Sequence, residues 1–214
     1  MKVVEIFKSI DGEGKRAGLP VTFIRLYGCN LHCSYCDTRY GCENNNYTEL
    51  SITDILNAVK KLGLKSITLT GGEPLIHEDV NCLIQTLLKN GCQVNIETNG
   101  SVNIEKYCGV SGLFLTMDYK CFTSGMQNMM NLNNLKLLNK KDVLKFVVGS
   151  DIDLYEAMDI LREYNPHCQV YFSPVFGKIE PSHIVDFILK NELNDCKVQL
   201  QMHKIIWDPD KRGV

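Results

Sequence analysis

Short apolar segments alternate with longer amphipathic segments along most of this 214-residue chain. The short segments are rich in β-branched residues and are almost continuously apolar, which is typical of strands buried on both faces of a sheet. We expect strands at 21–26, 66–70, 93–98, 113–118, 143–148, 169–173 and 197–201. Apolar residues at helical spacing predict helices near 52–62, 83–88, 154–161 and 181–188. This alternation predicts right-handed crossovers and a mostly parallel α/β sheet.

The length predicts one domain, 1–214, because a domain usually takes about 150 residues. Two stretches interrupt the alternation and are interpreted as an insertion at about 119–141 and a C-terminal tail at 203–214. The formal charge of -2 argues against a basic nucleic-acid-binding module, and no apolar run is long enough for a membrane span. Residues 1–8 lack the features of a secretory leader, so we expect a cytoplasmic protein whose ten cysteines are mostly reduced.

Three closely spaced cysteines follow the first predicted strand. Cys29, Cys33 and Cys36 form a C-x3-C-x2-C pattern, so their thiolates can converge on one metal centre. Structural zinc sites and iron–sulfur clusters usually take four protein ligands. Three ligands therefore leave one coordination position for a substrate or cofactor, unless His32 or Cys42 closes the site as in a structural zinc site.

A Gly-Gly-Glu-Pro turn follows the next predicted strand, beginning after Thr70. The glycines, Gly71 and Gly72, allow the backbone to approach a ligand closely. Glu73 and the free backbone groups of the turn could hold an amino-acid-like group. The carboxyl ends of parallel strands meet at one edge of a sheet, so this turn and the cysteine loop are expected to share one site.

These two motifs, in this order, resemble the radical S-adenosylmethionine superfamily. The resemblance implies that Cys29, Cys33 and Cys36 bind three irons of a 4Fe-4S cluster and that S-adenosylmethionine chelates the fourth. It also implies that the Gly-Gly-Glu-Pro turn holds the methionine end of that cofactor. Reductive cleavage of the cofactor would then yield a 5′-deoxyadenosyl radical that removes a hydrogen atom from the substrate.

Longer motifs resemble one family within this superfamily, the 7-carboxy-7-deazaguanine synthases. They are Arg25 and the segments 5–14, 36–38, 97–100, 199–207 and 212–214. The resemblance implies a partial (β/α)6 TIM-like barrel, a radical SAM core with an N-terminal extension and a C-terminal tail. It implies ring contraction of 6-carboxy-5,6,7,8-tetrahydropterin to 7-carboxy-7-deazaguanine with release of ammonia, as used in queuosine and 7-deazapurine biosynthesis.

The same resemblance assigns roles to individual residues. Thr38 matches a magnesium ligand of the family, and a hydroxyl ligand suits a hard cation that keeps its waters. The residues implied to bind the substrate are Ile10, Asp11, Gly12, Arg25, Thr70, His203 and Val214. Those implied to bind S-adenosylmethionine are Gly72, Glu73, Thr116, Met117, Asp118, Ser173, Pro174, Val175 and Phe176. The strand-end residues Glu97, Asn99, Lys120 and Lys145 remain open as either ligand contacts or structural bridges.

A radical enzyme of this kind also needs partners. The resemblance implies a one-electron donor such as flavodoxin and a homodimer, since an incomplete barrel leaves sheet edges exposed. One alternative is a glycyl-radical-enzyme activase, which shares the C-x3-C-x2-C pattern but acts on a protein. A second alternative is a non-catalytic zinc- or cluster-binding module, which would bind metal without cleaving S-adenosylmethionine.

Overall fold

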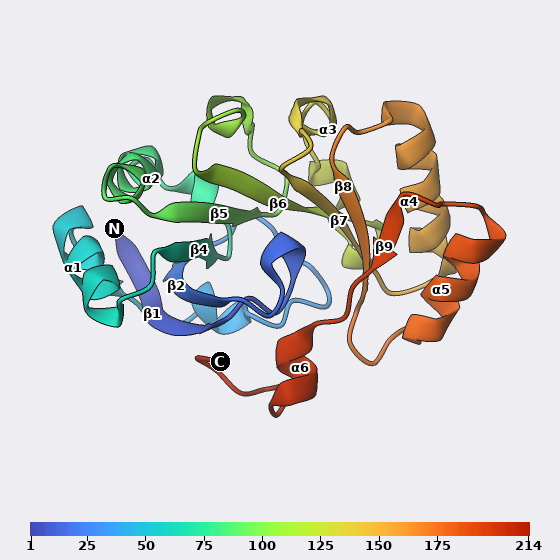
Figure 1. Cartoon of the computed structure of the whole chain (residues 1–214). Coiled ribbons are helices and arrows are strands. Elements are labelled where there is room, and N and C mark those ends of the chain that lie inside the picture. Colours follow the sequence, from blue (N-terminus) through green and yellow to red (C-terminus); the bar gives the residue numbers. More distant parts are fainter.

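One curved nine-stranded sheet forms the body of the molecule, and its longer helices lie along the convex side (Figure 1). In the computed structural model, which describes residues 1–214, the strand order is β3-β1-β2-β4-β5-β6-β7-β8-β9. All neighbours from β2 to β9 are parallel, whereas β1 pairs antiparallel with both β2 and β3. The strands are β1 (Lys2–Ile10), β2 (Pro20–Leu26), β3 (Thr48–Glu49), β4 (Ser66–Gly71), β5 (Gln93–Thr98), β6 (Leu113–Lys120), β7 (Val143–Val148), β8 (Gln169–Pro174) and β9 (Cys196–Val198).

The parallel strands confirm the predicted α/β class and the partial barrel. Six long strands, from β2 to β8 without β3, form the expected (β/α)6 core. The last predicted strand, 197–201, is shorter in the structure and ends at Val198. Strands β1 and β3 were not predicted. Most of β1 is only half-buried and its apolar residues do not form a continuous run, so periodicity gave a weak signal there.

The four predicted helices are present as α1 (Ile52–Leu62), α2 (Val80–Lys89), α4 (Asp151–Tyr164) and α5 (Pro181–Lys190). Helix α1 begins at a capping box between Ser51 and Asp54 and ends at Gly63, which has a φ of 78°. Two short helices, α3 (Asn134–Leu137) and α6 (Met202–Ile206), were not predicted because four or five residues cannot display a helical period. No helix combines the length and the apolar character needed to cross a membrane.

The two faces of the sheet carry different residues, because successive side chains of a strand point to opposite faces. On β4, Ile67 and Leu69 are fully buried in the apolar core that the sheet shares with the helices. Thr68 and Thr70 alternate with them and belong to the opposite, concave side. Apolar residues therefore hold the helices on the convex face, and the polar positions of the same strands are left for the concave face.

The N-terminal segment and the C-terminal tail both contribute to the concave side (Figure 1). The backbone N–H of Met202 at the start of α6 donates to the carbonyl of Gly12, at 3.0 Å. The side chain of Gln199 exchanges two hydrogen bonds with the backbone of Gly14, at 2.6 and 2.9 Å. These contacts fix the tail across the opening of the half-barrel, and the chain ends below the concave side of the sheet in Figure 1.

Candidate active site

The carboxyl ends of the parallel strands open into one cavity of about 840 Å³ on the concave side. Residues that are register partners on neighbouring strands line this cavity side by side. Arg25 on β2 is the register partner of Thr70 on β4, and Asp118 on β6 is the partner of Lys145 on β7. The volume lies within the range of about 300–1,000 Å³ that is usual for ligand cavities.

The loop after β2 carries Cys29, Cys33 and Cys36, and all three line this cavity. The N–H of Cys36 donates to the carbonyl of Cys33 at 3.2 Å, which closes a tight turn between these two cysteines. The N–H of Ser34 donates to the carbonyl of Ser124 at 3.0 Å, which fastens the loop to a short 3-10 turn after β6. These two hydrogen bonds hold the cysteine loop in place, with its three cysteines on the wall of the cavity.

These thiols have different environments. A hydrogen bond from the Cys42 thiol lowers the pKa of Cys29 to about 6, although burial opposes the change. Burial raises the pKa of Cys33. All ten cysteines are free, so no disulfide withholds a thiol from the site. Three soft thiolate donors on one loop, beside an open cavity, fit the protein share of a 4Fe-4S cluster with one iron left open.

The Gly-Gly-Glu-Pro turn packs directly against this loop. A Cβ at Gly72 would lie 2.5 Å from Cys29 Cβ and 2.6 Å from Cys42 Sγ, so only glycine fits there. The N–H of Glu73 donates to the carbonyl of Gly28 at 2.9 Å, which joins the two motifs through their backbones. The two motifs therefore form one compact surface at the carboxyl ends of β2 and β4.

The side chain of Glu73 lies beneath that surface and not on the cavity wall. Its carboxylate is fully buried and accepts hydrogen bonds from the N–H of Leu75 at 2.9 Å and the N–H of Asn99 at 2.6 Å. Thr98 Oγ1 donates to both of its oxygens at 3.0 Å. Burial raises the pKa of Glu73 to about 7 in spite of these donors. Glu73 thus anchors the segment after β5 to the glycine turn.

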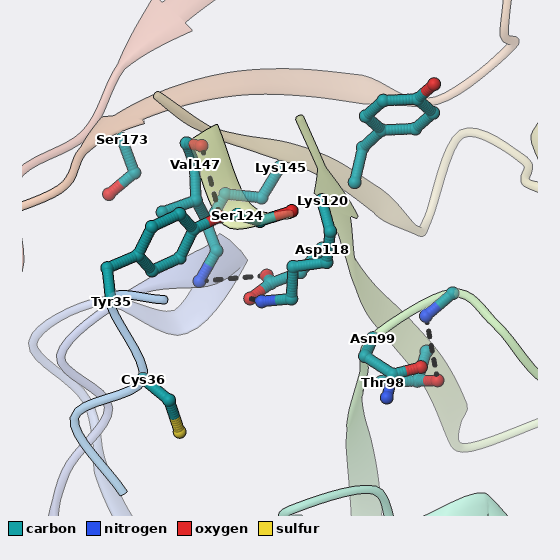
Figure 2. Close-up of polar contacts among 12 residues, drawn as sticks. Tyr35, Cys36, Thr98, Asn99, Asp118, Lys120, Ser124, Lys145, Val147 and Ser173 are labelled. Carbon is teal, nitrogen blue, oxygen red and sulfur yellow. Dashed lines mark hydrogen bonds and ion pairs between the residues drawn. The ribbon is translucent and has the colours of Figure 1, made fainter. Parts of the chain in front are cut away.

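A row of charged side chains also lines the cavity. Asp118 lies between two lysines, 2.9 Å from Lys120 Nζ and 3.0 Å from Lys145 Nζ (Figure 2). Lys145 also pairs with Glu13, which comes from the N-terminal segment. Burial favours the neutral form of Lys145, but the surrounding carboxylates raise its pKa well above the ordinary value. Burial also raises the pKa of Glu97, on the neighbouring strand, to about 7.

Arg25 also lines the cavity, and neighbouring residues hold its guanidinium in place. Its Nε donates to Glu5 on β1 at 2.8 Å, and its guanidinium carbon lies 5.9 Å from the centre of the Tyr40 ring. The guanidinium of Arg212, from the C-terminal tail, lies over the same ring at 4.1 Å. Arg25 is therefore a fixed cation on the cavity wall, between β1 and the tail.

The region from residue 23 to 117, which contains both motifs, matches the family model described as the radical SAM superfamily. Over the full chain, the sequence is 50% identical to the 7-carboxy-7-deazaguanine synthase of Clostridium acetobutylicum, covering 100% of this chain and 99% of that protein. The chain belongs to the 7-carboxy-7-deazaguanine synthase family. It is also 38% identical to the family member from Methanospirillum hungatei, over 98% of this chain and 86% of that one.

The fold agrees with this assignment. The crystal structure of QueE from Escherichia coli matches with a TM-score of 0.76 at 24% identity, covering 94% of each chain. Streptococcus suis SuiB bound to S-adenosylmethionine shares the fold over 84% of this chain and 46% of its own, with a TM-score of 0.59. As a radical SAM member of the 7-carboxy-7-deazaguanine synthase family, the chain binds a 4Fe-4S cluster and S-adenosylmethionine.

Most residues that the sequence assigned to the family's site lie on this cavity. The residues on its wall are Ile10, Gly12, Arg25, Cys29, Cys33, Cys36, Thr38, Thr70, Gly72, Asp118, Pro174, Val175, Phe176, His203 and Val214. The imidazole of His203 packs against Gly12, where any Cβ would collide with the ring. Burial lowers the pKa of His203 and thereby favours its neutral form.

Four further assigned residues lie outside the cavity wall, in addition to Glu73. Asp11 is buried and is bound by Arg16 Nε at 2.8 Å and by Thr68 Oγ1 at 2.6 Å. Thr116 Oγ1 donates to Asn95 Oδ1 at 3.0 Å. The other two are Met117, which packs against Gly100, and Ser173, whose hydroxyl donates to Glu13 at 3.4 Å. The side chains of these four residues contact other residues of the fold and do not line the cavity.

Several residues on the wall of this synthase-family site were not assigned from the sequence. Glu13 lies inside the 5–14 motif, but a single glutamate in a loop carries no signal of its own. Lys145 and Glu97 had been left open between ligand contact and structural bridge, and both line the cavity. Tyr35 also lines it, and its hydroxyl donates to the carbonyl of Val147 at 3.5 Å (Figure 2). Strand register places Glu97 and Lys145 on the cavity, whereas Glu13 and Tyr35 reach it through the folding of their loops.

Proposed function

We propose that this chain converts 6-carboxy-5,6,7,8-tetrahydropterin to 7-carboxy-7-deazaguanine with release of ammonia. One observation carries the proposal: three cysteine thiols and a glycine turn share a cavity with a fixed arginine and a row of ion-paired carboxylates and lysines. The relatives that carry this synthase name align over the whole chain at up to 50% identity. The 4Fe-4S cluster and S-adenosylmethionine, when bound, supply the radical that removes a hydrogen atom from the substrate.

Cys29, Cys33 and Cys36 are proposed as the cluster ligands, and Gly72 as the backbone contact for the methionine end of the cofactor. The second proposal is supported by the position of Gly72 on the cavity wall, in direct contact with the cysteine loop. Pro174, Val175 and Phe176 at the end of β8 are proposed to contact the adenosine. Glu73 is proposed to act only indirectly, by fixing the turn.

Arg25 is proposed to bind the carboxylate of the substrate. A guanidinium offers parallel N–H donors that match a carboxylate, and here Glu5 already fixes its orientation. We propose that Thr38 holds a magnesium ion near the same carboxylate. The only neighbouring acidic residue in sequence, Asp37, is paired with Lys204 at 2.7 Å. A single hydroxyl with substrate and water oxygens is a set of ligands that suits magnesium.

Glu13 and Glu97 are proposed to bind the aminopyrimidinone edge of the pterin. That edge presents adjacent N–H donors, and carboxylates pair with such donors in a bidentate manner. Lys145 fixes Glu13 through an ion pair and Asp118 fixes Lys145, so the donors and acceptors are oriented before the substrate arrives. With a pKa near 7, Glu97 can hold or release a proton at its carboxylate under neutral conditions.

The C-terminal tail is proposed to exclude water from the reacting centre. Residues 209–214 and His203 line the cavity opposite the sheet. The ion pair between Lys204 and Asp37 ties the tail to the cysteine loop. A reactive carbon radical needs such shielding, because water and other C–H bonds would otherwise intercept it. The imidazole of His203 and the end of the chain at Val214 are proposed to contact the pterin.

We propose that a one-electron donor such as flavodoxin reduces the cluster and that the chain forms a homodimer. The dimer is supported by the open edges of the sheet at β3 and β9, since an unpaired strand edge favours a partner. A reducing, cytoplasmic setting is supported by ten free cysteines in one chain. The electron donor follows from the proposed radical reaction, whereas the dimer and the cytoplasmic setting are independent of it.

An anaerobic turnover assay tests the reaction. The cluster-reconstituted protein is mixed with S-adenosylmethionine, a reductant, magnesium and 6-carboxytetrahydropterin, and 7-carboxy-7-deazaguanine is measured by mass spectrometry. We expect product from the unmodified chain and from Cys82→Ala, whose thiol is exposed on α2, but none from Cys33→Ala. Formation of 5′-deoxyadenosine without product would contradict the proposed substrate. Absence of both, at full iron loading, would contradict the radical reaction.

A further inference from the structure

The loop between β1 and β2, residues 11–19, closes on itself through backbone hydrogen bonds. The N–H of Asp11 donates to the carbonyl of Leu19 at 2.9 Å, and the N–H of Gly18 donates to the carbonyl of Asp11 at 2.8 Å. The N–H of Leu19 donates to the carbonyl of Arg16 at 2.8 Å. The backbone of this β1–β2 loop is therefore held together as one unit.

Arg16 fastens this loop to β4. Its buried side chain donates from Nε to Asp11 Oδ2 at 2.8 Å, and from Nη2 to the carbonyl of Ile67 at 2.8 Å and to Thr68 Oγ1 at 2.6 Å. Thr68 Oγ1 in turn donates to Asp11 Oδ1 at 2.6 Å. The guanidinium also lies over the ring of Phe114 on β6, 5.0 Å from its centre. One side chain thus joins the loop to the sheet.

Glu13 fastens the same loop to two other strands. Its carboxylate pairs with Lys145 on β7 and accepts a hydrogen bond from Ser173 Oγ on β8 at 3.4 Å. A Cβ at Gly14 would lie 3.0 Å from Thr116 Oγ1 on β6, so the loop packs directly on a strand that lies between its two attachments. The loop therefore crosses the concave side of the sheet from β4 to β7 and β8.

Stability alone does not account for the Arg16 anchor. The loss of hydration offsets the attraction within a buried ion pair, so apolar residues of similar volume often stabilise a fold equally well. The remaining nitrogen of Arg16, Nη1, is buried without a hydrogen-bond partner in the protein. A guanidinium does, however, present its donors in one rigid plane, so Arg16 binds Asp11 and β4 in a fixed relative orientation.

We propose that Arg16 is a positioning residue that holds Glu13 in place for the pterin by anchoring the β1–β2 loop to β4. This inference rests on the proposed role of Glu13 in binding the pterin. Lys145 restrains the Glu13 carboxylate, but an ammonium group is a point charge on a flexible stem and does not fix the backbone. Gln199 holds the backbone of Gly14 from the C-terminal tail, and Arg16 holds the loop from the sheet.

The competing role for Arg16 is purely structural. In that case its loss would lower the stability of the fold and would affect both ligands of the cavity alike. If Arg16 acts through Glu13, its loss should weaken only the steps that depend on the pterin. It should also have no further effect once Glu13 itself has been replaced, and a double-mutant comparison detects this difference.

The test is steady-state turnover of the reconstituted protein, with the pterin and S-adenosylmethionine varied in turn. Arg16→Lys keeps a cation beside Asp11 but cannot reproduce the planar fork that also reaches β4. We expect it to lower kcat/KM for the pterin about tenfold, the scale of one charge-assisted hydrogen bond. Its iron content and its KM for S-adenosylmethionine should equal those of the unmodified chain. Lys15→Ala, at an exposed position of the same turn, is the matched control and should leave all three values unchanged.

The comparison with Glu13 decides the route. The double variant of Arg16→Lys and Glu13→Gln should have the same kcat/KM for the pterin as Glu13→Gln alone, within about twofold. If Arg16→Lys does not fold, Thr68→Val carries the same comparison, because it removes only the hydroxyl that contacts both Arg16 and Asp11.

An unchanged kcat/KM for the pterin in Arg16→Lys would overturn the inference. So would a double variant in which the two losses multiply, or a KM for S-adenosylmethionine that rises as much as kcat/KM for the pterin falls. If the unmodified chain forms no product from the pterin, the proposed function fails instead, so the two failures are distinguishable.

Discussion

Replacing Gly72 with alanine puts a methyl group where the glycine turn meets the cysteine loop. Its Cβ would lie 2.4 Å from the carbonyl oxygen of Gly28, 2.5 Å from Cys29 Cβ and 2.6 Å from Cys42 Sγ. Ordinary van der Waals contact begins near 3.4 Å, so the loop backbone at Gly28 must retreat by about 1.0 Å, the difference between 3.4 and 2.4 Å. Overpacking of this kind costs about 1–3 kcal/mol. That is less than the ~5–15 kcal/mol stability of a typical domain, so the variant should fold.

The displaced loop should nevertheless bind its cluster poorly, because a metal site tolerates errors of only about 0.5 Å in its ligands. We expect Gly72→Ala to retain less than about half of the iron of the unmodified chain after anaerobic reconstitution. Iron and sulfide analysis measures this loss, and urea unfolding monitored by circular dichroism measures the stability.

Gly41→Ala is the matched control for this substitution. Gly41 lies between Tyr40 and Cys42, which both line the cavity, but its Cβ would meet only Arg25 Cδ at 3.7 Å and Val4 Cγ2 at 4.0 Å, which are ordinary contacts. We expect this variant to keep its iron and to change its stability by no more than about 1 kcal/mol, as a glycine-to-alanine change does where the backbone is unstrained. Full iron loading in Gly72→Ala, together with unchanged stability, would refute the claim that the two motifs are in close contact.

Three other substitutions address the buried charges. Asp11→Ala should lower the free energy of unfolding by about 3–5 kcal/mol in urea, because it leaves Arg16 buried without its partner; equal stability would show that the pair is not buried. The pKa of Glu97 is raised from 4.5 to about 7, so the folded state holds a proton that the unfolded state releases, and stability should fall as pH rises between these values. Glu97→Gln should reduce this dependence in urea titrations at several pH values, and the similar contribution of Glu73 should persist. Lys145→Met should lower product formation at least about tenfold at full iron content, because Glu13 and Asp118 lose their shared cation, and activity near the unmodified level would contradict the proposed pterin contacts.

The sequence was sufficient to predict the parallel sheet, because strands buried on both faces are nearly continuous apolar runs. β7, with the sequence Val-Leu-Lys-Phe-Val-Val, was predicted to the residue for this reason, whereas β5, also predicted to the residue, alternates apolar and polar residues. β1 escaped prediction because it pairs at the antiparallel edge, where only Val3 is buried. The interruption at 119–141 was interpreted as an insertion, but its first two residues continue β6. Strand ends are hard to place when polar residues belong to the site.

The parts of the site that could be predicted are those in which the spacing of residues along the sequence determines their chemical role. Cysteines at C-x3-C-x2-C spacing and two glycines after a strand constrain the backbone directly, so Cys29 and Gly72 could be placed together before the fold was known. Asp11 was assigned to the substrate through its neighbours in the motif, yet its carboxylate is committed to Arg16 and Thr68. The direction of a loop side chain depends on contacts with distant strands, which no local pattern encodes.

The register of β6 links the core to the chemistry of the cavity. Leu115 and Met117 belong to the apolar core, and Asp118, one position further, faces the cavity between two lysines. A shift of one residue would expose the apolar pair and bury the carboxylate among the helices, which would cost far more than any single hydrogen bond. The apolar contacts on the convex face therefore fix the charged groups on the concave face. Alternate residues of the same strands therefore determine the stability of the fold and the geometry of the site. A core substitution in β6 that is too mild to unfold the chain should still disturb the ion pairs of Asp118.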